Sequence, residues 1–522
     1  MSNDKNDILF ELIHSLTKSE KRQFRLYVGR LPRNNSANFI TLFDIILKSK
    51  KYDEDLILKK TNIKKQQLSN TKAHLYRQLL ISLKSNPKHQ NIPSQIREQL
   101  DFSNVLYNKG LYQQSLKILE KAKNLALKHQ ETNLAYEIVE FEKIIESQYI
   151  TRSMSNRADA LAIEAKDLSL QNVFSSKLSN LSLQLYSFLL KTGYARNEND
   201  HLFVKDYFEK RLPNYYFHEL NFKEKLFLHK AFLWYCFIVQ DFLGSYKYAK
   251  KWVMLFDEYP EMKKEHPVFY LKGMNYLLEA LFFVQKQKRH KKILSKLNND
   301  ILNYEFANSQ NTATLSFLYQ FQHQFNSFFL KGDFKKGVAF IPELLENLEQ
   351  QKSKLDAHHT MLFYYKIACM YFGAGDTKNS IFYLQKIISN KKLKMREDLL
   401  CFTRVLNLVA HYEAGIDYNI ENLIKTTYKF LIKMNDLHQV QKKMILFLRN
   451  LRNLYPHELK GAFVELHKEL KEFENHPYEK RSFLYLDILS WLESKIYNKP
   501  VETIIQEKLN YKTTKYNIFE KN

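Results

Sequence analysis

The segment from Leu56 to Arg97 contains nine Lys or Arg and no Asp or Glu, and it holds the side chains best suited to binding an anionic partner. Lysine and arginine can neutralise phosphate groups, while glutamine and asparagine can hydrogen-bond to the edges of nucleobases. The side chains that combine these two abilities here are Lys64, Lys65, Gln66, Gln67, Asn70, Lys72 and Arg77. The stretch therefore indicates a surface that contacts DNA or RNA.

The pattern around these side chains predicts two helices joined by a tight turn. A short helix should begin at Asp53, Asn62 should take a turn position that tolerates positive φ, and a second helix should begin near Lys64. The positions expected to face inward are Ile63, Leu68, Leu75 and Leu79. This leaves Gln66, Asn70 and Arg77 on the outer face, and segment 53–85 resembles a helix-turn-helix.

The alternative is that residues 1–90 form a helical bundle that only caps a longer array. Lys72 stands where a helix-turn-helix prefers an apolar residue, and no pair of strands follows to form a wing. Upstream, Thr17 and Glu20 have the spacing of a capping box. An apolar stripe of Phe39, Leu42, Phe43 and Ile46 predicts a further amphipathic helix. The sequence leaves both interpretations of this module open.

Two further basic clusters carry less information. Lys288, Arg289, Lys291 and Lys292 lie at a turn between expected helices, and Lys442, Arg449 and Arg452 share one helix face. Each cluster alone is typical of a solvated surface, although several such faces lining a groove could bind an acidic peptide or RNA.

Motifs for catalysis and for metal or cofactor binding are absent from the sequence. The run from Phe372 to Lys378 contains two glycines, but it follows a helix and lacks the spacing of a phosphate-binding loop. The pair His358 and His359 has no carboxylates at metal-ligand spacing. We therefore expect no enzyme activity, no cofactor and no metal site.

The composition of the 522 residues points to helices joined by short polar turns. Glycine (11) and proline (10) are each far below average usage, so a fold with many tight β turns is excluded. Cys236, Cys369 and Cys401 are far apart and should be buried thiols, and no apolar run is long enough to cross a membrane. We expect a cytoplasmic all-α protein, whose net charge of +24 partly reflects the lysine bias of AT-rich genomes.

Similar junctions recur between consecutive predicted helices. At Gly110, Gly332 and Gly375 an aromatic-rich helix ends, and an apolar stripe at helical spacing then resumes. Two weaker copies occur, one with Gln240 and Asp241 in place of the glycine and one at Gly415. These junctions resemble tetratricopeptide repeats, although spacings of 43 and 40 residues exceed the standard 34 and the consensus Trp and Pro are mostly missing.

The resemblance implies a superhelical solenoid of about nine or ten antiparallel helix pairs over residues 91–512, after the basic module 1–90 and before a frayed tail 513–522. It also implies a concave groove lined by helices 222–239, 266–284, 356–374 and 396–414. Our first functional hypothesis is a scaffold or adaptor whose groove binds a protein or peptide. The alternative is a nucleic-acid-binding regulator that uses the helix-turn-helix, with the array as sensor or dimerisation platform.

Overall fold

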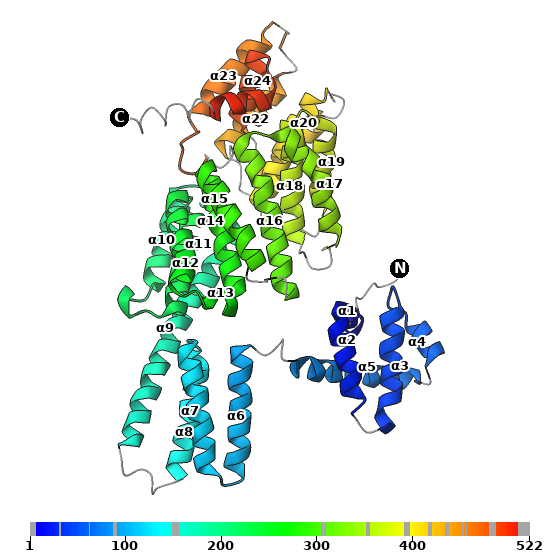
Figure 1. Cartoon of the computed structure of the whole chain (residues 1–522). Helices are drawn as coiled ribbons and strands as arrows, with labels where there is room; N and C mark the ends of the chain where they lie inside the picture. The colour runs from blue at the N-terminus through cyan, green and yellow to red at the C-terminus, as the bar shows by residue number, and fades with distance from the viewer. Residues whose placement is uncertain are drawn as a thin grey trace. The chain divides into compact units, whose positions relative to one another are not determined.

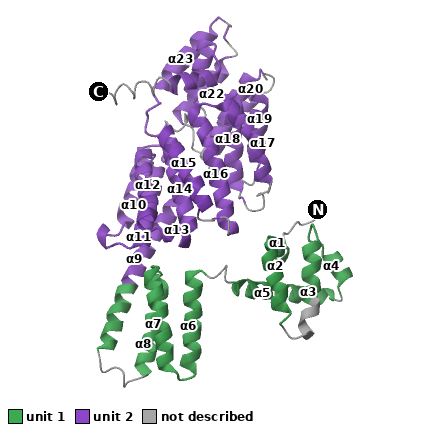
Figure 2. Ribbon diagram, viewed as in Figure 1, with its two compact units in different colours: residues 1–168 green, residues 169–522 purple. Residues whose placement is uncertain are grey.

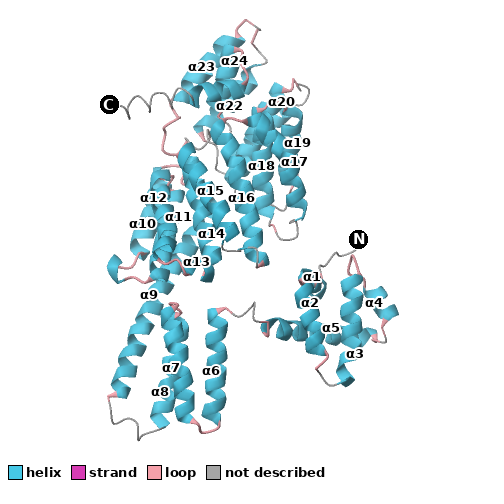
Figure 3. Cartoon of the chain, in the orientation of Figure 1, coloured by secondary structure: helices cyan, strands magenta, loops and turns pink. Residues whose placement is uncertain are grey.

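The computed structural model is helical throughout its described part (Figure 3). It describes residues 7–509 apart from 31–32, 62, 87–90, 149–155, 304–305, 307–308, 351–354, 356, 391–396, 416–419, 434–437, 452–453, 456 and 480–486. No strand occurs among these residues, so the expected all-α class is confirmed. The expected tail 513–522 and the turn residue Asn62 lie outside the described residues.

The chain divides into two compact units, residues 1–168 and 169–522 (Figure 2). Unit one holds two separate hydrophobic cores, one built from residues between Leu9 and Leu79 and one from residues between Ile96 and Leu168. Most of the buried apolar residues of unit two, from Leu181 to Leu492, form one continuous core. The first of these three cores belongs to the basic module, so this module does not share its interior with the helices that follow.

Five helices form the module: α1 (Ile8–Ser15), α2 (Lys18–Val28), α3 (Arg33–Lys48), α4 (Glu54–Lys60) and α5 (Lys65–Lys84). The predicted capping box opens α2, because the Thr17 amide donates to the Glu20 carboxylate at 2.7 Å and the Glu20 amide donates to Thr17 Oγ1 at 3.3 Å. The rings of Phe24 and Phe43 lie 4.9 Å apart between α2 and α3. All four residues of the predicted stripe on α3 are buried.

The expected two-helix segment is present in the described residues. Asp53 caps α4, with its carboxylate accepting from the Leu56 amide at 3.0 Å. The four residues 61–64 then separate α4 from α5. All four positions predicted to face inward, Ile63, Leu68, Leu75 and Leu79, are buried. The structure thus confirms which face of α5 packs against the module and which face is free.

The remaining helices run along the chain without a strand between them (Figure 1). In the first unit these are α6 (Ile92–Asn108), α7 (Tyr112–Lys128), α8 (Thr132–Gln148) and the start of α9 (Arg157–Thr192). The second unit continues with α10 (Glu198–Arg211), α11 (Phe222–Ile238), α12 (Phe242–Glu258), α13 (Met262–Glu265), α14 (Pro267–Phe283), α15 (Gln287–Asn303), α16 (Gln310–Lys331), α17 (Phe334–Gln350), α18 (Ala357–Gly373), α19 (Thr377–Ile388), α20 (Glu397–Glu413), α21 (Ile420–Lys433), α22 (Gln439–Asn450), α23 (Leu459–Lys471) and α24 (Ile488–Tyr497).

One turn geometry recurs between paired helices. Its left-handed residue is the predicted Gly110, Gln240, Gly332, Gly375 or Gly415, and φ at these positions lies between 60° and 86°. In the first four of these turns the following amide reaches back to a carbonyl of the preceding helix, as Asp376 does to Tyr371 at 2.9 Å. The predicted role of these residues is confirmed. Gln130 and Gln285 adopt the same conformation, and the sequence pattern did not reveal them because glutamine is uncommon at positive φ.

The four helices predicted to be first in their pairs are observed as α11, α14, α18 and α20, each within one residue of the expected bounds. Buried residues occur all round α11 and α14, whereas α15 buries only His290, Leu294 and Leu297. The first helices are therefore packed on several sides, and the second helices on one. Some helices interrupt the succession of pairs. The helices α10 and α13 stand between pairs, α13 has only four residues, and α9 is 36 residues long.

A chain of buried polar side chains crosses α14, α16 and α18. Lys366 Nζ donates to Asn326 Oδ1 at 2.8 Å, and Asn326 Nδ2 donates to His323 Nδ1 at 3.5 Å. His323 Nε2 then donates to Asn275 Oδ1 at 2.8 Å. This order of donors requires a neutral His323, because a protonated ring has no acceptor nitrogen. Burial, the neighbouring His290 and the Lys366 ammonium all hold the pKa of His323 well below its usual value.

We predict that acid destabilises unit two through these histidines. Burial, together with Lys366 and Lys331, lowers the pKa of His290 to about 4. Below pH 6.5 the unfolded chain then binds more protons than the folded chain. The contribution of His290 to the free energy of unfolding is therefore present at neutral pH, and it is lost as pH falls towards the folded pKa. For His290 alone the loss between pH 7 and pH 5 is about 2 kcal/mol.

The measurement is the thermal midpoint of the full chain between pH 7 and pH 5, followed by circular dichroism. His290→Leu should make the decrease in midpoint less steep. His218→Leu serves as the control, because the His218 side chain is 78% exposed. Equal pH dependence in the unaltered protein and in His290→Leu would show that folding does not shift the pKa of this ring, and the prediction would be wrong.

Candidate nucleic-acid interface

The free face of α5 carries most of the residues predicted to contact nucleic acid. Lys64, Lys65, Gln66, Asn70 and Arg77 are all exposed. Gln66, Asn70 and Arg77 follow one another at spacings of four and seven residues, so they form one stripe along α5 that is about 16 Å long. The structure brings these side chains together on one surface, which is free of carboxylates along the whole of α5.

Two of the predicted contact residues, Lys72 and Gln67, form hydrogen bonds or a salt bridge within the module. The Lys72 ammonium pairs with the Asp7 carboxylate and lies 2.9 Å from the Tyr52 hydroxyl, with its Nζ 4.3 Å from the centroid of the Tyr52 ring. Burial lowers the pKa of Lys72, but these two partners outweigh it and raise the pKa overall. Gln67 Oε1 accepts from the Lys64 amide at 3.3 Å, so this side chain caps the start of α5.

The contacts of Lys72 also join α5 to the first helix of the module. Asp7 is the N-cap of α1, where its Oδ1 accepts from the Phe10 amide at 3.0 Å. The salt bridge between Lys72 and Asp7 therefore links α5 to α1, at a position that a helix-turn-helix usually fills with an apolar residue. Lys72 is partly buried in this contact, whereas the Gln67 side chain is exposed.

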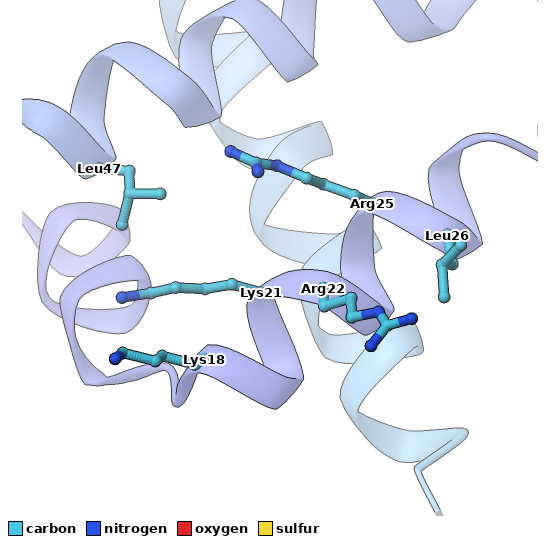
Figure 4. Close-up of a pocket in the computed structure, with 6 residues that line it drawn as sticks. All are labelled: Lys18, Lys21, Arg22, Arg25, Leu26 and Leu47. Carbon is cyan, nitrogen blue, oxygen red and sulfur yellow. The ribbon is translucent and has the colours of Figure 1, made fainter.

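A second basic surface lies on α2 and was not predicted. Lys18, Lys21, Arg22 and Arg25 line an open hollow of about 410 Å³ together with Leu26 and with Leu47 of α3. Figure 4 shows Lys18, Lys21 and Arg25 extending toward the side of Leu47. Arg25 pairs with Asp44 at 2.6 Å, whereas no carboxylate among the described residues lies within salt-bridge distance of Lys18, Lys21 or Arg22.

The signal for this second surface was present in the sequence. The four basic residues recur at i, i+3, i+4 and i+7 after Thr17, which places them on one face of the helix that the capping box opens. The net charge of the whole module does not reveal this surface, because it does not show which basic residues share a helix face. The module thus presents two basic surfaces. One is the exposed face of α5 with Lys64, Lys65 and Arg77, and the other is the hollow on α2, in which Arg25 is paired with Asp44.

In the other two predicted basic clusters, the residues that the structure describes are exposed to solvent. Lys288, Arg289, Lys291 and Lys292 are exposed on α15, and Lys442 and Arg449 are exposed on α22. Arg452 lies outside the described residues. Arg289 reaches the Tyr246 hydroxyl at 3.4 Å.

Three observations bear on other kinds of site. Each of the three cysteines is a buried thiol that forms no disulfide, as predicted, and burial raises the pKa of Cys236 and of Cys369 to about 12. Within the described residues, no group of three or more His, Cys, Asp or Glu side chains could hold a metal ion. None of the helices that the structure describes combines the length and the apolar character needed to cross a bilayer.

Comparison of the chain with protein-family models, with curated proteins and with solved structures finds no match. The geometry of the module and of the helix pairs therefore carries the functional argument alone.

We predict that Lys72→Met loosens the module. Loss of the partly buried pair with Asp7 should cost about 1 kcal/mol, which raises the hydrogen-exchange rates of amides in α1 and α5 about fivefold. Lys65→Met, which removes an exposed lysine from the same helix, should leave these rates unchanged. The measurement is hydrogen exchange of the full chain followed by mass spectrometry. Unchanged exchange in Lys72→Met would contradict the structural role assigned to this lysine.

Proposed function

We propose that this chain is a non-catalytic binding protein whose amino-terminal module contacts duplex DNA. The observation that carries the proposal is the carboxylate-free, exposed stripe of Gln66, Asn70 and Arg77 on the second helix of a two-helix segment. Such a helix can enter a major groove, where amide side chains and arginine hydrogen-bond to base edges. Lys64 and Lys65 at its start are placed to neutralise backbone phosphates.

The hollow on α2 supports the same proposal. A helix that packs across the recognition helix commonly contacts the DNA backbone, and Lys18, Lys21 and Arg22 provide three cations without a carboxylate partner among the described residues. The acidic residues Asp53, Glu54 and Asp55 gather at the start of α4, at the opposite end of this helix from the turn into α5. The separate core of the module favours a binding role over a role as a cap, because a cap shares its apolar interior with the array it covers.

We further propose that the helical array binds a protein partner. The recurrence of one helix pair and one left-handed turn favours repeats of the tetratricopeptide-like kind, stacked as a solenoid whose first helices line a groove. In this proposal the chain is a cytoplasmic regulator or adaptor that joins a protein partner to nucleic acid.

We predict that the full chain binds duplex DNA with a strong dependence on salt. A plot of the logarithm of the binding constant against the logarithm of the salt concentration should have a negative slope. In the triple variant Lys18→Gln, Lys21→Gln, Arg22→Gln this slope should be less steep by about 0.9 for each phosphate that the variant no longer neutralises. The triple variant Gln66→Ala, Asn70→Ala, Arg77→Ala should weaken binding about tenfold or more, because base contacts are each worth about 1–3 kcal/mol. Fluorescence anisotropy with a labelled duplex at increasing salt measures both effects.

The control is Lys288→Gln, Lys291→Gln, which removes two exposed charges from α15 and should leave DNA binding unchanged. Equal affinity in the α5 triple variant and the unaltered protein would remove α5 from the interface. Tighter binding to duplex RNA than to DNA would contradict docking in a major groove, because that groove is too narrow in A-form helices.

We predict that the array retains a partner when nucleic acid is removed. Affinity purification of the full chain from its native host, with and without nuclease, should yield the same stoichiometric protein in both cases. Recovery of the partner only before nuclease treatment would show that nucleic acid, and not the array, holds it.

A further inference from the structure

An aromatic–lysine–aromatic pattern repeats on two successive first helices of the array. Phe227, Lys230 and Trp234 on α11 recur as Phe269, Lys272 and Tyr276 on α14, each 42 residues further along the chain. The rings meet across the two helices in matched pairs. The Phe227 and Phe269 centroids lie 6.2 Å apart, and those of Trp234 and Tyr276 lie 4.8 Å apart, both edge to face. Lys230 and Lys272 therefore lie in the interval between two inter-helix aromatic pairs.

The two lysines stand close together in a partly apolar setting. Lys230 Nζ is 5.3 Å from the Phe227 centroid, 5.4 Å from the Phe269 centroid and 5.8 Å from the Trp252 ring, so its ammonium lies among rings of α11, α14 and α12. Burial and the nearby Lys272 ammonium lower the pKa of Lys230 to about 8. Burial likewise lowers the pKa of Lys272. Both side chains keep partial contact with solvent.

Neither lysine has a carboxylate partner among the described residues. Two other shielded lysines of the chain do. Lys123 pairs with Glu142 at 2.8 Å, and Lys263 pairs with Asp257 at 3.3 Å. Two adjacent ammonium groups without a counter-ion repel each other and lose hydration, and a bound anion would relieve both costs.

We propose that Lys230 and Lys272 form a binding site for the carboxylate side chains of an acidic protein segment. The proposal rests on the array binding a protein partner, and it names the chemistry by which the partner is recognised. The two aromatic pairs provide apolar walls on either side of the cations, suited to the methylene groups of glutamate. These rings pack edge to face against each other, at interplanar angles of 88° and 79°.

The test uses the full chain and a fluorescein-labelled glutamate-rich peptide, with the glutamine counterpart as the neutral probe. The glutamate peptide should bind, and Lys230→Gln, Lys272→Gln should weaken it about tenfold or more. Lys230→Arg, Lys272→Arg should keep most of the affinity, because the charge is retained. The matched control is Lys288→Gln, Lys291→Gln, which removes two exposed charges from the same array and should leave the affinity unchanged.

Two further measurements separate a ligand site from a structural role. The thermal midpoint of the double Gln variant should be equal to or higher than that of the unaltered protein, because two repelling charges are removed. Bound glutamate peptide should also slow the reaction of Lys230 with an amine-selective reagent, read by mass spectrometry. A large drop in the midpoint, or unchanged labelling at saturating peptide, would overturn the site.

Several outcomes identify a different answer. Equal weakening in the double Gln variant and the Lys288 and Lys291 control would reduce the effect to general charge, and the site would be wrong. Displacement of the peptide by single-stranded DNA, or equally well by inorganic phosphate, would also overturn a carboxylate site. If the host partner is captured equally by the double Gln variant and the unaltered protein, the partner proposal stands and only the site fails.

Discussion

The left-handed turn between paired helices is the constraint on which the array depends. A short reversal with one residue at positive φ returns the chain alongside the helix that it has just left, and it satisfies the last carbonyls of that helix by backbone bonds. Each pair is then amphipathic as a unit, so it has to stack on its neighbours to bury its apolar side. This explains why buried residues occur all round α11 and α14, while α15 is buried on one side only.

The same stacking explains where polar side chains can act in the array. Deep between the first helices, Lys366, Asn326 and His323 satisfy one another and contribute to a fixed register rather than to recognition. Nearer the surface, Lys230 and Lys272 keep partial contact with solvent. The difference between a structural lysine and one that a ligand can reach is therefore how deeply the side chain is buried between the helices.

Local patterns predicted most of the fold. The capping box at Thr17, the inward leucines of α5 and the bounds of α11, α14, α18 and α20 follow from spacing alone, because each reflects interactions within one helix or turn. Interactions between distant residues were not predictable. Lys72 was placed among the DNA contacts because nothing in its neighbours reveals Asp7, 65 residues away. The hollow on α2 was likewise hidden until charge was resolved by helix face.

The distribution of charge argues against a purely compositional origin of the basic module. A lysine bias of the genome acts on the whole chain, yet the module carries +10 in 90 residues and the other 432 residues carry +14. In the array, some lysines such as Lys123 and Lys443 pair with glutamates within 3.0 Å. On α2 and α5, Arg25 pairs with Asp44 and Lys72 with Asp7, but no carboxylate among the described residues pairs with Lys18, Lys21, Arg22 or Arg77. Uncompensated charge on an exposed helix raises self-repulsion in the fold, and a polyanion that binds these faces would offset it.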